Sequence, residues 1–182
     1  MLSDPCDRVQ VRVTFLRMAH APAYPPRPLP GGTQVLPVRE PTVAFYRFLY
    51  NTVGGPYLWW LRRAAPDRDI AILLANPRLT LHVLYRGGAP AGFYELERRA
   101  GGETNLSYFG LMPHAVGQGL GTPFLHHAIT TAWAEAPTAL TVNTCTADHP
   151  RALPGYLAAG FVPIREAPEL WSIPRRLGLK LP

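Results

Sequence analysis

Three glycines within five residues indicate an anion-binding turn in the second half of the chain. Gly117, Gly119 and Gly121 follow an alternating segment typical of a buried strand and precede apolar residues that repeat at helical spacing. Glycine has no side chain that would keep a ligand from the backbone, and the first N–H groups of a helix have no partner within the helix. The segment therefore predicts a phosphate site at a helix N-terminus.

The spacing of these glycines narrows the kind of phosphate site. A nucleotide P-loop requires a lysine directly after its last glycine, but Thr122 follows Gly121. The dinucleotide fingerprint G-x-G-x-x-G also fails, because Gly121 comes one residue too early. A helix start at which the glycines only form a tight turn is the structural alternative.

A second segment supports the phosphate-binding interpretation. The residues D-H-P-R-A-L-P-G-Y-L-A-A-G-F at 148–161 follow a predicted strand at 140–145. In this order and separation the two segments resemble the GCN5-related N-acetyltransferases (GNAT), which carry [QR]-x-x-G-x-[GA] and then N-x-x-A-x-x-x-Y-x-x-x-G-F. Val116 replaces the first polar residue of the loop, and His149 replaces the asparagine. The resemblance covers roughly residues 79–165.

The resemblance implies acetyl-CoA as the cofactor and an α/β fold with a GNAT-like central mixed sheet and helices on both faces. It implies a kinked strand before the loop that would expose backbone amides to the thioester carbonyl. We expect this kink at Phe109 to Met112, where Gly110 readily allows a bulge. The positions expected to contact the cofactor are Gly110, Leu111, Met112, Pro113, Val116, Gly117, Gln118, Gly119, Leu120, Gly121, Thr122, His149, Arg151, Ala152 and Tyr156.

Acetyl transfer from a thioester to an amine needs a base for the amine, a stabilised oxyanion and an acid for the departing thiolate. By its family position Tyr156 is the candidate acid. Glu95 is the candidate base, with a solvated surface carboxylate as the alternative. His149 fits a cofactor contact better than a base, and we expect Asp148 to cap the helix that begins at Pro150.

The acceptor is expected to be a primary amine of a small molecule or peptide, because this is what the resemblance implies. Trp59, Trp60 and Tyr108 are the expected acceptor-binding residues, and simple core packing of the tryptophans is the alternative. The sequence does not identify the acceptor. A non-catalytic acyl-CoA-binding module is the competing interpretation of the same motifs.

Composition excludes several other classes of protein. The net charge is +6, but the arginine pairs are scattered, so we expect no nucleic-acid partner. No segment approaches the ~20 apolar residues that span a bilayer, and no signal-peptide pattern begins the chain. Cys6 and Cys145 lie far apart and have no metal-binding spacing. We expect a cytoplasmic protein with no metal and no membrane contact, and homodimerisation is left open.

Local patterns predict the elements that must position these residues within one domain over 1–182. Proline and glycine make 21–34 a loop or arm. Strands are predicted at 8–18, 35–39, 79–85, 91–97, 105–112, 140–145 and 161–165. Helices are predicted from Pro41 to the glycine pair at 54–55, at 67–74, after the glycine-rich turn, and from Pro150.

Overall fold

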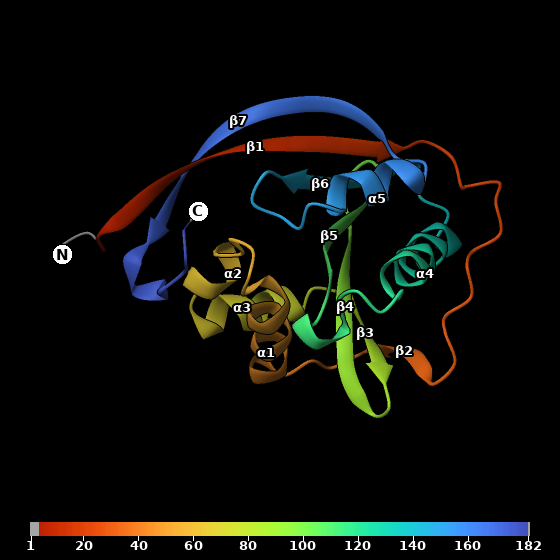
Figure 1. Ribbon diagram of the computed structural model, residues 1–182, viewed down its shortest axis with the longest axis horizontal. Helices are drawn as coiled ribbons and strands as arrows, with labels where there is room; N and C mark the ends of the chain where they lie inside the picture. Colours follow the sequence, from red (N-terminus) through yellow and green to blue (C-terminus); the bar gives the residue numbers. More distant parts are fainter. Residues whose placement is uncertain (1–3, 182) are drawn as a thin grey trace.

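The computed structural model describes residues 4–181, whose strands form a seven-stranded sheet of order β2-β3-β4-β5-β6-β1-β7 (Figure 1). Neighbouring strands run antiparallel except for the parallel pair β5 and β6. The strands are β1 (Cys6–Met18), β2 (Thr33–Val38), β3 (Leu79–Arg86), β4 (Ala89–Arg98), β5 (Thr104–Leu111), β6 (Leu140–Cys145) and β7 (Val162–Pro174).

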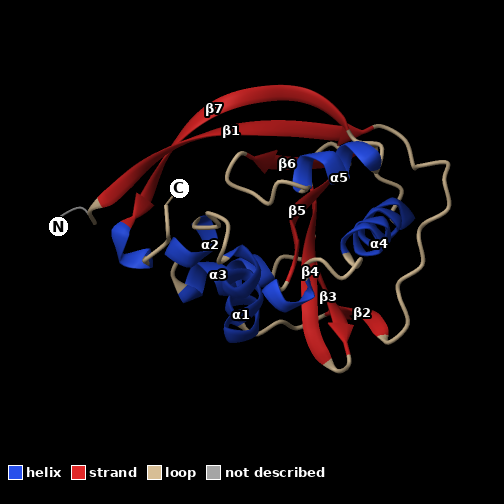
Figure 2. Ribbon diagram, viewed as in Figure 1, coloured by secondary structure: helices blue, strands red, loops and turns tan. Residues whose placement is uncertain are grey.

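Helices cover both faces of this sheet, which confirms the predicted fold class (Figure 2). One side carries α1 (Val43–Gly54), α2 (Leu61–Ala64) and α3 (Asp67–Leu74), and the other carries α4 (Gly121–Ala134) and α5 (Ala152–Ala158). Short 3-10 helices occupy Pro113–Ala115 and Arg175–Leu177. None of the helices within 4–181 is long and apolar enough to cross a membrane.

Strand β4 is the rigid centre of the fold because helices bury it from both faces. Every residue from Ala91 to Leu96 is buried, although the sequence alternates only partly. On one face Tyr46 and Tyr50 of α1 are almost completely buried, and on the other Phe124 of α4 is fully buried. The sheet therefore provides a fixed platform for side chains on β4 and β5.

Several predicted boundaries were wrong, among them those of the proline-rich loop and of the last strand. The loop predicted at 21–34 ends at residue 32, because β2 begins at Thr33. The last strand was predicted to end near Arg165 but continues to Pro174. The prolines of this segment predict an early end of the strand, because proline has no N–H for a sheet hydrogen bond. β7 is an edge strand, however, and no hydrogen bond is lost where a proline nitrogen faces its open side. The ends of the expected 1–182 domain lie outside the described residues.

The first and last strands form a long antiparallel ribbon. β1 pairs with β7 from Cys6 opposite Pro174 to Arg17 opposite Val162. This ribbon arches over the region between α2 and β6 (Figure 1), and it joins the sheet through the pairing of β1 with β6. The N-terminal strand therefore lies inside the sheet, between two strands from the C-terminal part of the chain.

Candidate active site

The site begins where two parallel strands separate. β5 and β6 pair only over residues 104–106 and 140–142. Beyond Leu106 the edge of β5 that faces β6 has no strand partner among the described residues. A bulge lies at the same place, because Leu106 is opposite Leu96 while Tyr108 is opposite Glu95. The bulge turns the rest of β5 away from β6.

The bulged residue is Ser107, so the expectation that Gly110 forms the bulge was wrong. Gly110 continues the regular ladder opposite Phe93. Its role is steric, because a Cβ on Gly110 would lie 2.4 Å from Cγ1 of Val53 on α1. Glycine at this position therefore lets α1 approach β5 closely.

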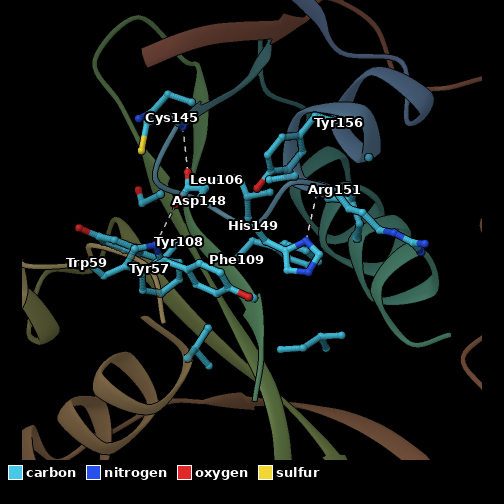
Figure 3. Close-up of a pocket in the computed structure, with 18 of the residues that line it drawn as sticks. Tyr57, Trp59, Leu106, Tyr108, Phe109, Cys145, Asp148, His149, Arg151 and Tyr156 are labelled. Carbon is cyan, nitrogen blue, oxygen red and sulfur yellow. Dashed lines mark hydrogen bonds between the residues drawn. The ribbon is translucent and has the colours of Figure 1, made fainter. Parts of the chain in front are cut away.

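The divergence of β5 and β6 opens into a cavity of about 1160 Å³. This volume exceeds that of a typical pocket for one small ligand, so the cavity has room for a cofactor arm and an acceptor. Figure 3 shows Tyr57, Trp59 and Tyr108 on one side of the cavity and Tyr156 and Arg151 on the other.

The backbone of the glycine-rich turn shows whether a diphosphate could bind there. Among the described residues no hydrogen-bond acceptor was found for the backbone N–H groups of 117–122. Gly117 and Gly119 have φ angles of +80° and +75°, and a Cβ on either would meet no atom within 4 Å. No side chain within 4–181 caps α4, which begins at Gly121. The turn is thus an open set of amides at a helix N-terminus, which suits a diphosphate.

The side chain of Gln118 is held away from these amides. Its carboxamide accepts a hydrogen bond from the guanidinium of Arg86 and donates one to the carbonyl of His114. Arg86 ends β3 and brings a positive charge next to the turn. Sequence reasoning missed Arg86, because the contact joins residues from distant parts of the chain.

The structure brings together most of the predicted cofactor residues. Those that line the cavity are Gly110, Leu111, Val116, Gly117, Gly119, Leu120, Gly121, Thr122, His149, Arg151, Ala152 and Tyr156. Gln118, Met112 and Pro113 are not in the lining. Met112 is instead buried in the core, and Pro113 begins a 3-10 helix.

Tyr156 projects from α5 into the cavity and is only 6 % exposed. Its ring contacts Phe109 and Phe161 edge-on. Burial raises the pKa of Tyr156, and the negative charge of Asp148 raises this pKa further. The phenol is therefore protonated at neutral pH and can donate a hydrogen bond into the cavity.

Glu95 lies beneath the cavity rather than at its surface. Its side chain is 0 % exposed and accepts hydrogen bonds from Tyr46 Oη at 2.7 Å and from Arg62 at 3.4 Å. Burial raises the pKa of Glu95, although Arg62 and Tyr46 oppose this shift. The guanidinium of Arg62 in turn lies 5.6 Å from the ring centre of Tyr108, and both residues line the cavity.

Asp148 does not cap α5, so that expectation was wrong. Its Oδ2 accepts hydrogen bonds from Thr144 Oγ1 at 2.8 Å and from the backbone N–H of Cys145 at 2.9 Å. Its Oδ1 accepts from Trp59 Nε1 at 3.2 Å (Figure 3). The carboxylate thus joins the end of β6 to the segment after α1. The sequence gives no sign of this contact, because Trp59 and Asp148 are 89 positions apart.

The hydrogen bonds of His149 select its tautomer. Nδ1 accepts a hydrogen bond from the backbone N–H of Arg151 at 3.0 Å. A neutral His149 therefore carries its proton on Nε2 and is a donor there. This geometry favours a contact with a cofactor oxygen over a role as base.

Two of the three residues expected to bind the acceptor, Trp59 and Tyr108, belong to an aromatic cluster. Trp59, Trp60 and Tyr108 all line the cavity, and the ring centres of Trp59 and Tyr108 are 5.0 Å apart. Tyr50 packs against both rings, with centre distances of 5.3 Å to Trp59 and 4.9 Å to Tyr108. Within 4–181 no group of three or more His, Cys, Asp or Glu residues could hold a metal ion.

Burial raises the pKa of the Cys145 thiol to about 11, and the nearby Asp148 carboxylate raises it as well. The thiol is therefore protonated at neutral pH, which disfavours Cys145 as a nucleophile.

Comparison with protein families agrees with this geometry. Residues 40–161 match the model of the acetyltransferase (GNAT) family. The matched part includes β5, the glycine-rich turn, α4, β6 and α5. The chain therefore belongs to the GNAT acetyltransferase family, as the motifs predicted. Members of this family in general use acetyl-CoA and act on amine acceptors.

Solved structures share this fold at low sequence identity. An IAA acetyltransferase from Bacillus cereus is 22% identical, with 73% of this chain and 79% of that chain covered at a TM-score of 0.56. A GCN5-related N-acetyltransferase from Sphaerobacter thermophilus is 14% identical, with 93% and 54% covered and a TM-score of 0.60. A tandem GNAT protein from the clavulanic acid biosynthesis pathway is 14% identical, with 92% and 55% covered and a TM-score of 0.63. The chain spans little more than half the length of these last two proteins. The comparison with curated proteins found no match.

Proposed function

We propose that the protein is an acetyl-CoA-dependent N-acetyltransferase that acetylates a primary amine by direct attack. The observation that carries the proposal is that open backbone amides, the free edge of β5 and Tyr156 all border one cavity. Family membership supports the reaction class. The chain matches only part of the length of several similar proteins. The proposed activity therefore refers to this chain and not to those longer proteins.

The proposed cofactor contacts follow from the open groups of the site. The amides of 117–122 would hold the diphosphate, with Arg86 and the N-terminal end of α4 adding positive potential. The free edge of β5 at 107–111 would face the pantetheine arm, which carries amide groups that can pair with a strand edge. His149 and Arg151 would cover the arm from the other side of the cavity.

Bound acetyl-CoA would supply an activated thioester, and the chain would provide orientation and proton transfer. Unpaired backbone N–H groups at the free edge of β5 are the proposed donors for charge that develops on the carbonyl oxygen. As the amine nitrogen bonds to the carbonyl carbon and the C–S bond breaks, Tyr156 would donate its proton to sulfur. A proton released by the amine would then restore the phenol, so the protons balance over one turnover.

Glu95 has a different proposed role from the base expected at first. A base in contact with the amine would have to face the cavity, whereas Glu95 faces Tyr46 and Arg62. We therefore propose that Glu95 positions Arg62 beside Tyr108 and that water relays the amine proton to the Tyr156 phenolate. The network would then fix the shape of the acceptor side.

Thiol release from acetyl-CoA against a panel of amines is the direct test of this function. At least one primary amine should support thiol release above the rate of spontaneous hydrolysis, and mass spectrometry should detect its acetyl amide. Tight acetyl-CoA binding without turnover of any amine would contradict the transferase and favour a binding module. We also propose a cytoplasmic location, because Cys6 and Cys145 are free thiols.

A further inference from the structure

The middle of the inner face of the β1–β7 ribbon carries one charge among apolar residues, between Asp7 at one end of the row and Arg165 at the other. Directly paired residues share a face, so Val9, Val11 and Val13 lie beside Trp171, Glu169 and Ala167. Among these residues only Glu169 is charged. The hydrophobic alternation of β1 and β7 would favour an apolar residue at this register position, so the carboxylate requires a separate explanation.

Glu169 faces the cavity and has no cationic partner in the described part of the chain. The lining includes Glu169, Trp171 and Val13. Among the described residues, the only hydrogen-bond donor to the Glu169 carboxylate is Trp171 Nε1, at 2.8 Å. No Lys, Arg or His within 4–181 lies within ion-pair distance of it. An uncompensated anion in the cavity favours a cationic ligand.

The cationic groups on the proposed acceptor side are already engaged. Arg62 pairs with Glu95, and Arg99 lies 3.6 Å from Glu97. The remaining cavity arginine, Arg151, precedes α5 on the cofactor side. An acceptor with a carboxylate would therefore meet Glu169 without a free arginine beside it, whereas a cation would compensate that charge.

Aromatic rings next to Glu169 strengthen this preference. Trp171 donates to the carboxylate, and Trp171 and Trp60 pack against the same apolar cluster beneath the ribbon. Both indoles also line the cavity. An indole face attracts an ammonium group, and a carboxylate beside it adds direct ion pairing.

We propose that the acceptor carries a second cationic group besides the amine that is acetylated. Glu169, Trp60 and Trp171 bind this second cation beneath the ribbon, while the reacting amine reaches the point where β5 and β6 separate. The substrate class is thus a diamine or an amine with a comparable basic group. This inference rests on the proposed acetyltransferase function and names the acceptor class of the same site.

Matched α,ω-diamines, monoamines and ω-amino acids of increasing chain length test the proposal through kcat/KM for thiol release. The best diamine should exceed the monoamine of equal length by about tenfold or more, and the amino acid should be the poorest acceptor. Glu169→Gln should abolish the diamine preference through KM, with kcat and the KM for acetyl-CoA unchanged.

Glu166→Gln is the matched control, because Glu166 is exposed on the same strand and does not line the cavity. It should keep the diamine preference. Equal kcat/KM for diamines and monoamines, or an unchanged preference in Glu169→Gln, would overturn the acceptor class while the transferase function stands. If no amine in the panel supports thiol release and calorimetry detects no diamine binding, both proposals fail. Diamine binding that Glu169→Gln removes, without turnover, would support the cation site and contradict the transferase.

Discussion

Gly119 combines a left-handed backbone with open space, and this combination provides a test of the amide turn. Gly119→Ala should weaken acetyl-CoA binding by about tenfold, because a methyl group would project into the cradle and a φ of +75° strains an L-residue. Isothermal titration calorimetry measures the change. Thermal unfolding should show a loss of about 1 kcal/mol from the backbone strain.

Gly101→Ala is the matched control for this substitution. Gly101 has a φ of +87°, a Cβ at this position would also meet no atom within 4 Å, and the residue does not line the cavity. The variant should lose similar stability but keep full acetyl-CoA affinity. Equal affinity of both variants for acetyl-CoA would count against the turn as the diphosphate site.

Tyr156→Phe tests the proposed acid. The variant should lower kcat by about a hundredfold, because it removes the proton donor, and should leave the dissociation constant of acetyl-CoA nearly unchanged. Tyr24→Phe is the control, since Tyr24 Oη donates to the carbonyl of Ala159 and lies outside this cavity. An unaltered kcat in Tyr156→Phe would remove Tyr156 from the chemistry.

The sequence predicted the local residues of the site better than its long-range partners. The glycine turn and Tyr156 were predictable because each belongs to a motif of consecutive or regularly spaced residues. Arg86, Asp148 and Glu169 were not, because their positions depend on contacts between distant segments. Asp148 was wrongly predicted to cap α5 because that prediction rested only on the helix that follows it in the sequence.

At the level of elements, the close approach of α1 to β5 depends on Gly110 and Val53. Gly110→Ala should destabilise the fold by about 1–3 kcal/mol, because its Cβ would lie 2.4 Å from Cγ1 of Val53. Val53→Ala removes the clashing methyl groups, so the double variant should be more stable than the sum of the two single losses predicts. Urea denaturation measures all three variants. Strict additivity would contradict the steric account.

His82 on β3 makes the stability of the fold depend on pH. Its ring stacks on Tyr94, with ring centres 4.7 Å apart. Burial, with a smaller contribution from His127, lowers the pKa of His82 from 6.5 to about 4. Between these values the unfolded chain binds more protons than the folded chain, so stability falls as pH decreases from 6.5 towards 4.

His82→Phe should remove this contribution, which we expect to be about 2 kcal/mol because His82 is partly exposed. Urea denaturation across the same pH interval measures it, with the exposed His20 replaced by Phe as the control. A pH dependence that is the same in the wild type and in His82→Phe would contradict the burial argument.

Element types were more predictable than element ends. α3 and β6 match their predicted bounds, because a regular pattern and clear flanking residues define them. The predicted end of β7 came too early, because its prolines and Glu169 interrupt the alternation that identifies a strand. The predicted position of the bulge was wrong. A sequence shows where a glycine allows a kink, but the register of the paired strands determines which residue is the extra one.

For the whole molecule, the position of β1 is the feature that the sequence did not reveal. The pattern of β1 predicts a strand but not its neighbours, and pairing between the two ends of a chain leaves no local signal. The ribbon of β1 and β7 lies outside the part that matches the family model, 40–161, and it covers the proposed acceptor side of the cavity. The proposed phosphate site lies within the matched part, whereas Glu169 of the proposed cation site lies outside it.

Calorimetric titration of the intact protein with acetyl-CoA and with S-acetylpantetheine tests the central claim most directly. Both carry the thioester, but only acetyl-CoA has the diphosphate that the amides of 117–122 would bind. Acetyl-CoA should bind about a hundredfold more tightly, since two charge-assisted hydrogen bonds account for a difference of this size. Equal affinities, or no heat of binding with acetyl-CoA, would contradict the account.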